Sequence, residues 1–337
     1  MKKLLIIFCV LFLFLTGCKQ EQIDSYSETG FYFDTVITIS IYDRDINGEA
    51  LINECFKMCK DFQVKIDKNN VESDIYKINT SKGKAVNISE TTYSLIEKSF
   101  YYSELSKGKF DISIGSLVDL WDINNNNKVP PIKSITKCLK TIGYKNILLL
   151  ENNTIKLSNP DAKLDLGGLA KGYVGDLLKQ YLLDNGVKSA IIDLGGNIIL
   201  VGSKNADPSP CDFKVGIGKP FGETNQYIAT IQASNKSIVT SGIYQRYFES
   251  NGKIYHHILD PKTGYPVNNN LFSVTIISDK SVDGDGLSTS IFSLGLKEGL
   301  STINQLQNIE AIFVTSENEI IVSDGLNIDN DNLITIK

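Results

Sequence analysis

The chain has 337 residues, of which 22% are charged, and a formal net charge of −5. This length allows one large domain or two domains with a sizeable core, and the composition is that of a globular protein. Since 34 Lys and Arg residues are balanced by 39 Asp and Glu residues, with no long run of one sign, the sequence predicts no basic patch and argues against nucleic acid as a partner.

The first residues have the pattern of an export signal. Lys2 and Lys3 precede an apolar run at 4–15, which is short for a membrane span and fits the centre of a signal peptide. An uncleaved anchor helix is the alternative. Residues 15–18 read L-T-G-C and resemble the lipobox of bacterial lipoproteins, whose cysteine is lipidated. The expected parts are a lipoprotein signal peptide at 1–17, a lipid on Cys18, a polar tether at 18–29 and one domain at 30–337, with the protein anchored to the cell membrane and facing outside the cytoplasm.

The other cysteines of the mature chain are Cys55, Cys59, Cys138 and Cys211. An even number in an exported protein permits disulfides, but Cys55 and Cys59 are poorly spaced for one on a helix. The only histidines are adjacent, at 256 and 257, so a zinc site is not indicated. We interpret these four cysteines as buried thiols.

The first half of the chain mixes strands and helices. The pattern of apolar residues predicts a strand at 31–42, helices at 49–66 and 91–106, a capped helical turn at 73–79, a short helix ending near 141, and a hairpin of strands at 147–150 and 154–157. The stretch at 108–121 is apolar but interrupted by glycine, which indicates a loop packed against the rest of the protein.

Strands dominate the second half. The segment at 163–183 reads as the end of a strand, a glycine turn and a helix. The remaining predicted elements are a strand pair at 189–202, strands at 213–217, 226–232, 237–240, 244–249, 253–258 and 271–278, a helix within 280–295, a helix near 298–306, and strands at 311–315 and 319–322. This mixture predicts an α+β fold.

The segment at 280–295, KSVDGDGLSTSIFSLG, holds candidate metal ligands. Asp285 and Thr289 are four residues apart, so on a helix both lie on one face and can offer oxygen ligands to a hard cation. The alternative is that D-G-D-G forms an ordinary turn and that the polar residues cap the helix. Asp283 does not share the spacing of four, so we interpret it as a turn residue.

Three other segments carry candidate binding groups. Glycines in DLGGLAKG at 165–172 would let the backbone approach a phosphate, with Lys171 adding a positive charge, although the segment matches neither a Walker loop nor G-x-G-x-x-G and a plain strand-to-helix turn is the alternative. Ser241 and Arg246 could present a hydroxyl and a guanidinium to a phosphate or ribose, or belong to a surface hairpin. His257 could be a general acid or base, or a structural histidine.

Taken together, these segments resemble the ApbE family of FAD:protein FMN transferases, over nearly the whole mature chain. The segments with near-identical spelling, in the family's order, are GKFDISIGSLVDLW at 108–121, LDLGGLAKGY at 164–173, IIDLGGNIILVG at 191–202 with VTSGIYQRYF at 239–248, YHHILDPKTGYPV at 255–267, and the segment at 280–295. The resemblance implies mixed sheets of a T-fold-like kind with flanking helices, and an FAD site in a cleft between two sub-domains.

The resemblance also implies an activity. FAD would bind with its pyrophosphate on Mg2+, and FMN would move to a threonine or serine hydroxyl of an exported protein through a phosphoester bond, with release of AMP. Exported subunits of Rnf-type or sodium-pumping NADH:quinone reductase complexes would be acceptors. FAD hydrolysis to FMN and AMP at the same site, and a flavin-binding lipoprotein without catalysis, are the alternative functions.

Site residues follow from the resemblance position by position. It implies metal ligands at Asp285 and Thr289, with Ser288 where some members have a further ligand and the carbonyl group of Gly168 completing the set. Contacts to FAD are implied for Phe33, Lys109, Phe110, Asp111, Asp165, Lys171, His257 and Ile258, to which Ser241 and Arg246 are added from their own chemistry. His257, or an aspartate near the metal such as Asp285, would take the proton of the acceptor, with Lys171 or Arg246 assisting.

The chain departs from the family pattern in two places. It has Phe33-Asp34-Thr35 where many members have M-G-T, so Phe33 would replace a sulfur contact to the flavin by packing. Lys109 replaces the small residue of G-A-F-D. The aromatic residue that stacks on the flavin in some members has no clear counterpart near 67–72.

Overall fold

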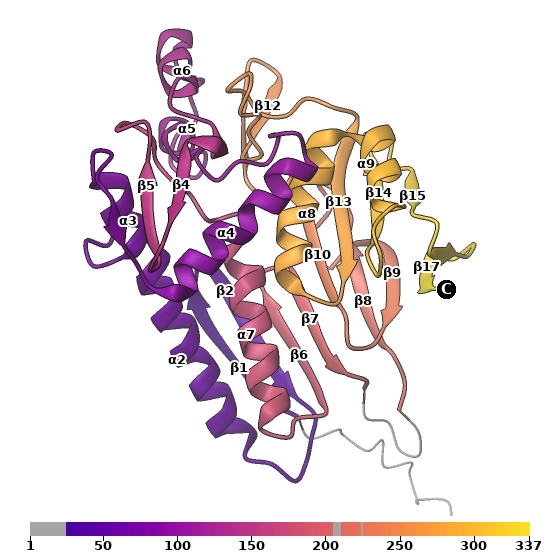
Figure 1. The fold of residues 1–337 in the computed structure, drawn as a ribbon. Helices are drawn as coiled ribbons and strands as arrows, with labels where there is room; N and C mark the ends of the chain where they lie inside the picture. Colours follow the sequence, from indigo (N-terminus) through magenta and orange to yellow (C-terminus); the bar gives the residue numbers. More distant parts are fainter. Residues whose placement is uncertain (1–24, 205–209, 224) are drawn as a thin grey trace, which may run out of the picture.

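The structure is a computed structural model that describes residues 25–204, 210–223 and 225–337 (Figure 1). The expected signal peptide, the lipidation site Cys18 and the first residues of the expected tether lie outside these described residues. Within the described ranges, no helix is both long and apolar enough to cross a membrane.

An eight-stranded sheet, antiparallel throughout, forms the centre of the molecule. In spatial order its strands are β1 (Tyr26–Tyr32), β2 (Thr35–Ile41), β6 (Ser189–Leu194), β7 (Asn197–Gly202), β10 (Ser237–Gly242), β13 (Leu271–Ser278), β14 (Glu310–Thr315) and β15 (Ile320–Val322).

Three smaller sheets surround the large one. The first contains β16 (Leu326–Ile328), β17 (Leu333–Ile336), β9 (Tyr227–Ala233) and β8 (Phe213–Gly218), the second contains β3 (Val86–Asn87), β5 (Thr154–Leu157) and β4 (Ile147–Leu150), and the third is the hairpin of β11 (Tyr247–Ser250) and β12 (Lys253–His256). Only the β17–β9 pair is parallel among these.

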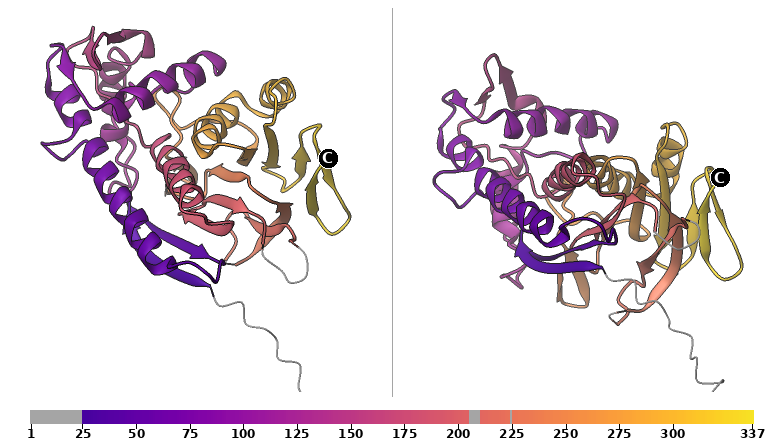
Figure 2. Two further views of the ribbon diagram at one scale, coloured as in Figure 1. Left: turned by 60° about the horizontal axis from the view of Figure 1, so that its bottom comes forward. Right: turned by 90° about the horizontal axis from the view of Figure 1, so that it is seen from below.

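Helices cover one face of the large sheet, as Figures 1 and 2 show. The covering helices are α2 (Gly48–Ile66), α7 (Ala170–Asp184), α8 (Ser281–Leu294) and α9 (Leu296–Ile303), and α4 (Glu90–Leu105) packs on α8 from outside. The shorter helices are α3 (Asp74–Thr80), α5 (Gly115–Trp121) and α6 (Ile132–Leu139). Antiparallel sheets with a separate helical layer confirm the predicted α+β class.

The alternation of side chains along the strands explains this layering. In β2 every second residue, Ile37, Ile39 and Ile41, is buried under the helices. On the opposite face of the sheet, Leu200 and Ile238 belong to a second apolar cluster, which the β8–β9 sheet covers. The large sheet thus has a core on each face, and helix α8, which carries the candidate metal ligands, lies on the helical face.

A third apolar cluster forms around Trp121, which is fully buried. Its indole N–H donates to the carbonyl oxygen of Gly264 at 2.8 Å, and its ring stacks on Tyr255 with centroids 5.7 Å apart. The cluster therefore fixes the segment at 255–267, which includes His257, to α5.

Two predictions for the first half of the domain are wrong. The single strand at 31–42 is a hairpin, because Phe33 and Asp34 both have positive φ (53° and 57°) and form a two-residue turn between β1 and β2. As a result, residues 26–29 of the expected tether belong to β1. The expected loop at 108–121 ends in the helix α5, whose cap Asp122 is left-handed.

The remaining differences are small. β3, β16 and β17 are short strands that the pattern did not indicate. Cys55 and Cys59 are buried on α2, and burial raises the pKa of each thiol to about 12. Cys138 is half-buried and Cys211 is exposed, so the prediction of buried thiols is wrong for Cys211.

Candidate active site

Helix α8 is the element that organises the site. It is buried on nearly all sides, and its glycines make this possible. A Cβ on Gly284 would lie 2.5 Å from a methyl group of Val239, and one on Gly286 would lie 2.5 Å from the Tyr102 ring. The glycines of the D-G-D-G sequence therefore allow α8 to pack closely on β10 and α4. The alternative interpretation of this stretch as a turn is wrong, because it lies within α8.

Asp285 lies on the face of α8 that meets α7. Its side chain is 7% exposed, with Oδ1 accepting a hydrogen bond from Nδ2 of Asn197 at 2.6 Å and Oδ2 accepting one from the backbone N–H of Gly172 at 2.5 Å. Burial raises the pKa of Asp285, whereas Lys171 and these two donors act in the opposite direction. Each carboxylate oxygen keeps a further lone pair for another partner.

Three hydroxyl groups gather on the same helix face. The Oγ of Ser241, on β10, lies 2.8 Å from Oγ of Ser288 and 3.3 Å from Oγ1 of Thr289. Ser288 also donates to the carbonyl oxygen of Asp285 at 3.1 Å. Asp285 and Thr289 thus share one face of α8, as their spacing of four residues predicts, and Ser288, which the family resemblance implies as a ligand, lies beside them.

The carbonyl oxygen of Gly168 is the remaining predicted ligand. In a regular helix it would accept from the N–H of Gly172, four residues later. That N–H donates to Asp285, and among the described residues no backbone N–H donates to Gly168. The carbonyl oxygen therefore remains available. Gly168 also lies against Phe110, since a Cβ at this position would be 3.2 Å from its ring.

These donors fit a hard cation. The candidate ligands are all oxygen atoms: one carboxylate, two hydroxyls and a carbonyl, which suit Mg2+ better than a soft metal. Within the described part of the chain, no group of three or more His, Cys, Asp and Glu residues could hold a metal ion. Mg2+ commonly completes its coordination with water and substrate phosphates.

Two cationic side chains flank the oxygen cluster. Nζ of Lys171 donates to the carbonyl oxygen of Gly195 at 3.5 Å. Desolvation lowers the pKa of Lys171, Asp285 opposes this, and the charge of Arg246 adds to the lowering. Part of the Arg246 residue is exposed to solvent, but the protein around its guanidinium group lowers its pKa by desolvation, while Asp165 and Asp34 oppose the shift. A bound anion would offset the effect of the Arg246 charge on Lys171.

His257 lies beside these cations. Its Nδ1 is 3.2 Å from the carbonyl oxygen of Arg246, which can only accept, so Nδ1 carries the proton and Nε2 keeps its lone pair. Burial lowers the pKa of His257 to about 3, with Arg246, His256 and Lys171 adding to the effect. The neighbouring His256 is structural, since its Nε2 bonds the carbonyl of Val267 at 2.9 Å.

The predicted flavin segment lies next to the glycine turn. The ring of Phe110 is 5% exposed and meets the Tyr102 ring edge-on with centroids 5.9 Å apart. Both carboxylate oxygens of Asp111 are used within the protein, by Ser113 at 2.6 and 2.8 Å and by the N–H of Tyr144 at 2.7 Å. Asp111 therefore stabilises the surrounding backbone through hydrogen bonds to Ser113 and Tyr144. A direct contact between Asp111 and FAD stays a prediction.

The other predicted contacts occupy different environments. Asp165 accepts from Nζ of Lys68 at 3.2 Å and from the N–H of Gly167 at 2.9 Å. Phe33 stands at the β1–β2 turn, where its N–H donates to Oε1 of Gln63 at 2.8 Å. Lys109 is half-buried. Ile258 is 4% exposed and belongs to the main core. Their roles as flavin contacts stay predictions.

The sequence did not predict the contacts of three residues around the site. Asn197 holds Asp285, and the signal available for it was an amide at the start of an otherwise apolar strand, directly after Gly195-Gly196. Lys68 holds Asp165, and nothing in its local sequence indicates this. The interpretation of Asp283 as a turn residue is wrong, because it lies in α8 and accepts from Tyr102 Oη at 2.6 Å and from Lys98 Nζ at 2.9 Å.

Comparisons with known proteins identify the family of the chain. The model of the ApbE family matches residues 33–313. A protein of Klebsiella pneumoniae (strain 342) named FAD:protein FMN transferase is 36% identical over 301 residues, which are 88% of this chain and 92% of that protein. A protein of the same name from Treponema pallidum (strain Nichols) is 29% identical and covers 91% of this chain and 89% of its own length.

Solved structures show the same fold. The ApbE protein of Thermotoga maritima superimposes with a TM-score of 0.81 at 31% identity, covering 89% of this chain and 97% of that one. The flavin transferase ApbE of Vibrio cholerae gives a TM-score of 0.77 at 23% identity, covering 89% and 97% respectively.

Fold and site together define a class, an α+β protein with a cluster of oxygen side chains beside basic side chains, which is a candidate cation site. The matching family model and the Klebsiella relative specify it further: the chain belongs to the ApbE family and is a flavinyltransferase.

Proposed function

We propose that this protein transfers FMN from FAD to a threonine or serine hydroxyl of exported proteins, through a phosphoester bond, in an Mg2+-dependent reaction that releases AMP. The observation that carries the proposal is the convergence of Asp285, Ser288 and Thr289 beside Lys171. One carboxylate and several neutral oxygens next to a basic side chain suit a cation that shares its coordination with a pyrophosphate. The family relatives carry the name of this activity.

The pyrophosphate of FAD would bind between Lys171 and Arg246. The charge of Arg246 lowers the pKa of Lys171, and a bound anion would offset this effect. Asp285, Ser288, Thr289 and the Gly168 carbonyl would hold Mg2+. The flavin would extend toward Phe110 and Phe33, whose rings line the neighbouring segments. In this arrangement the reacting phosphorus would lie near His257, which is electrostatically coupled to both cations.

The bonds that change are those of a phosphoryl-type transfer. The acceptor hydroxyl oxygen forms a bond to the phosphorus of the FMN half, and the bond from that phosphorus to the oxygen bridging to AMP breaks. AMP leaves with the electron pair, and the hydroxyl proton passes to a base. When bound, Mg2+ supplies charge neutralisation on the pyrophosphate oxygens. Lys171 holds the same oxygens in position.

His257 would receive the proton. The hydrogen bond from Nδ1 to the Arg246 carbonyl leaves Nε2 as an acceptor in a fixed orientation. Its pKa is low in the substrate-free site because of burial and the nearby cations. Binding of the negatively charged pyrophosphate offsets these cations, which raises the pKa of His257 and makes it a stronger base when substrate is present.

The test is to incubate the protein lacking residues 1–18 with FAD, Mg2+ and an exported subunit of an Rnf-type complex, and then to weigh the subunit. The proposal predicts a mass gain equal to FMN on a threonine or serine, together with AMP. AMP without a mass gain would instead support FAD hydrolysis. Unchanged FAD would contradict both enzymatic functions and favour a flavin-binding protein without catalysis.

The location of the protein is part of the proposal. A lipid on Cys18 would hold the domain at the outer face of the cytoplasmic membrane, because L-T-G-C follows a signal-like apolar run. Exported subunits of Rnf-type or sodium-pumping NADH:quinone reductase complexes would be acceptors on that side. Labelling with radioactive palmitate in a bacterial host, with Cys18→Ala as control, tests the anchor, and label on both chains would contradict it.

A further inference from the structure

Helix α8 carries the candidate metal ligands but has no cap of its own. Its N-cap residue, Lys280, makes no side-chain capping hydrogen bond. The first N–H groups of a helix need acceptors, and a buried helix start without them is unfavourable. Here the acceptor comes from another helix: Asp176, on α7, receives hydrogen bonds from the N–H of Ser281 at 2.6 Å and of Val282 at 3.0 Å.

Helices α7 and α8 are joined at two places, and at each place a carboxylate of one helix accepts from one or two backbone N–H groups of the other. At one place the carboxylate of Asp176 on α7 accepts from the backbone of α8. At the other, the carboxylate of Asp285 on α8 accepts from the backbone of α7, at Gly172. Gly172 and Asp176 are four residues apart, so both face α8 from successive turns. These three hydrogen bonds, two to Asp176 and one to Asp285, together fix the axial position of α8 relative to α7.

Helices α7 and α8 pack closely between these two sets of hydrogen bonds. A Cβ on Gly172 would lie 2.3 Å from the carbonyl oxygen of Ser281, so the two backbones are in direct contact. A shift of the start of α8 would therefore act on Asp285 one turn later. Because Lys171 and Gly168 belong to α7 and the turn before it, the same shift would separate the two halves of the cation site.

We infer that Asp176 is a positioning residue for the cation site, which holds α8 in the register that brings Asp285 to the start of α7. The inference rests on the proposed function for its relevance to catalysis, but its structural part is independent of it. Asp176 itself contacts none of the candidate ligands. Its effect must pass through the Ser281 and Val282 amides.

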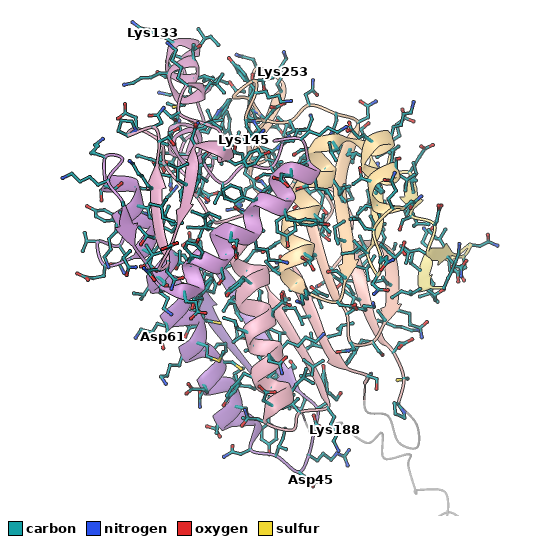
Figure 3. The ribbon with its side chains drawn as sticks, in the orientation of Figure 1. Asp45, Asp61, Lys133, Lys145, Lys188 and Lys253 are labelled. Atoms are coloured by element: carbon teal, nitrogen blue, oxygen red, sulfur yellow. The ribbon has the colours of Figure 1, made fainter. Side chains whose placement is uncertain are left out.

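The chain contains a matched control. Asp43 also accepts from two successive backbone N–H groups, those of Lys188 and Ser189, both at 2.9 Å. Lys188 follows the C-terminal end of α7, at the lower end of the molecule in Figure 3, whereas Gly172 is at the N-terminal end. The 15-residue α7 separates the two places by about 20 Å. Asp43→Asn therefore replaces a carboxylate that accepts from two backbone N–H groups, as Asp176→Asn does, but at a position away from the candidate site.

The first experiment uses the full chain without metal or FAD and follows amide hydrogen exchange. In Asp176→Asn the Gly172 amide should exchange at least about tenfold faster, a loss of about 1.4 kcal/mol in local stability. In Asp43→Asn it should match the wild type. Equal exchange of the Gly172 amide in the two variants would overturn the inference. If Asp176→Asn does not fold, Asp176→Glu, which keeps the charge but lengthens the side chain, takes its place.

The second experiment measures binding of Mn2+ by electron paramagnetic resonance in the presence of FAD. Loss of a residue that orients metal ligands typically weakens metal binding by about 10- to 100-fold, so Asp176→Asn should show this loss and Asp43→Asn should not. Equal affinities would contradict the inference. A wild-type protein that binds Mn2+ but cleaves no FAD would contradict the proposed function instead, while the exchange result would still stand.

Discussion

Replacement of Asp285 by asparagine separates the structural role of this residue from its chemical role. The two side chains have the same shape, but asparagine has one acceptor oxygen and one NH2 group. In the wild type both carboxylate oxygens face donors, the Gly172 N–H and Asn197 Nδ2. One of these donors must therefore oppose the new NH2 group in the variant, which costs about 1–3 kcal/mol.

The loss of charge acts in the opposite direction on stability. Burial raises the pKa of Asp285, so the ionised carboxylate is itself a destabilising group in the folded protein. The two effects offset each other, and the free energy of unfolding of Asp285→Asn should differ from the wild type by about 2 kcal/mol or less. The variant should fold and should be measurable.

Activity should respond much more strongly. Asp285 is the only carboxylate among the candidate metal ligands, and the charge stabilisation supplied by a bound metal is worth several kcal/mol. A loss of about 4 kcal/mol is about a thousandfold in rate. The assay is FMN attachment to the acceptor, followed by mass, together with the free energy of unfolding from denaturant titration.

Asp193→Asn is a suitable control for this variant. Asp193 is half-buried, accepts from the N–H of Gly196 at 2.9 Å and interacts electrostatically with Lys171, but is not a candidate metal ligand. Its loss should change the rate by less than about tenfold, which is 1.4 kcal/mol. If Asp285→Asn keeps more than a tenth of the wild-type rate with an unchanged Mg2+ requirement, the assignment of Asp285 as metal ligand is wrong.

Three further predictions concern the same region. Gly172→Ala places a Cβ 2.3 Å from the Ser281 carbonyl oxygen, so thermal unfolding should show a loss of about 1–3 kcal/mol, and an unchanged melting temperature would contradict the close packing. His257→Gln should lower kcat for transfer by about 10²- to 10⁴-fold with FAD affinity retained, and a normal kcat would remove His257 as base. Burial raises the pKa of Asp176 to about 6 despite its hydrogen bonds, with Asp283 adding to the rise and Lys179 opposing it. A folded-state pKa above the unfolded value near 4 means that this carboxyl contributes stability at low pH that is lost as pH rises from about 4 to 6. Asp176→Asn should abolish that part of the dependence of unfolding free energy on pH, and an unaltered slope would contradict it.

Local patterns were sufficient for most of the secondary structure. The hairpin at 147–157 and the helix at 49–66 follow directly from apolar periodicity and turn residues, and α2 differs from the prediction by one residue. The β1–β2 turn was missed because Phe33 adopts a positive φ, which is rare for an aromatic residue and has no signal in the sequence.

The candidate site likewise has a part that the sequence predicted and a part that it did not. The spacing of Asp285 and Thr289 predicted their common face, because both lie on one helix. The partners of that face could not be predicted, since Asn197, Ser241 and Gly172 come from three other elements and meet α8 only through the fold. Asp176 was missed for the same reason, because a cap supplied by another helix leaves no pattern near the helix that it caps.

The most direct test of the central claim is the position of a metal ion in a crystal of the protein with FAD and Mn2+, measured by anomalous diffraction. We expect one strong peak within about 2.0–2.6 Å of oxygens of Asp285, Thr289 and the FAD pyrophosphate, with Lys171 against the same phosphates. Ordered FAD with no peak at Asp285, or a peak bound by other residues, would contradict it.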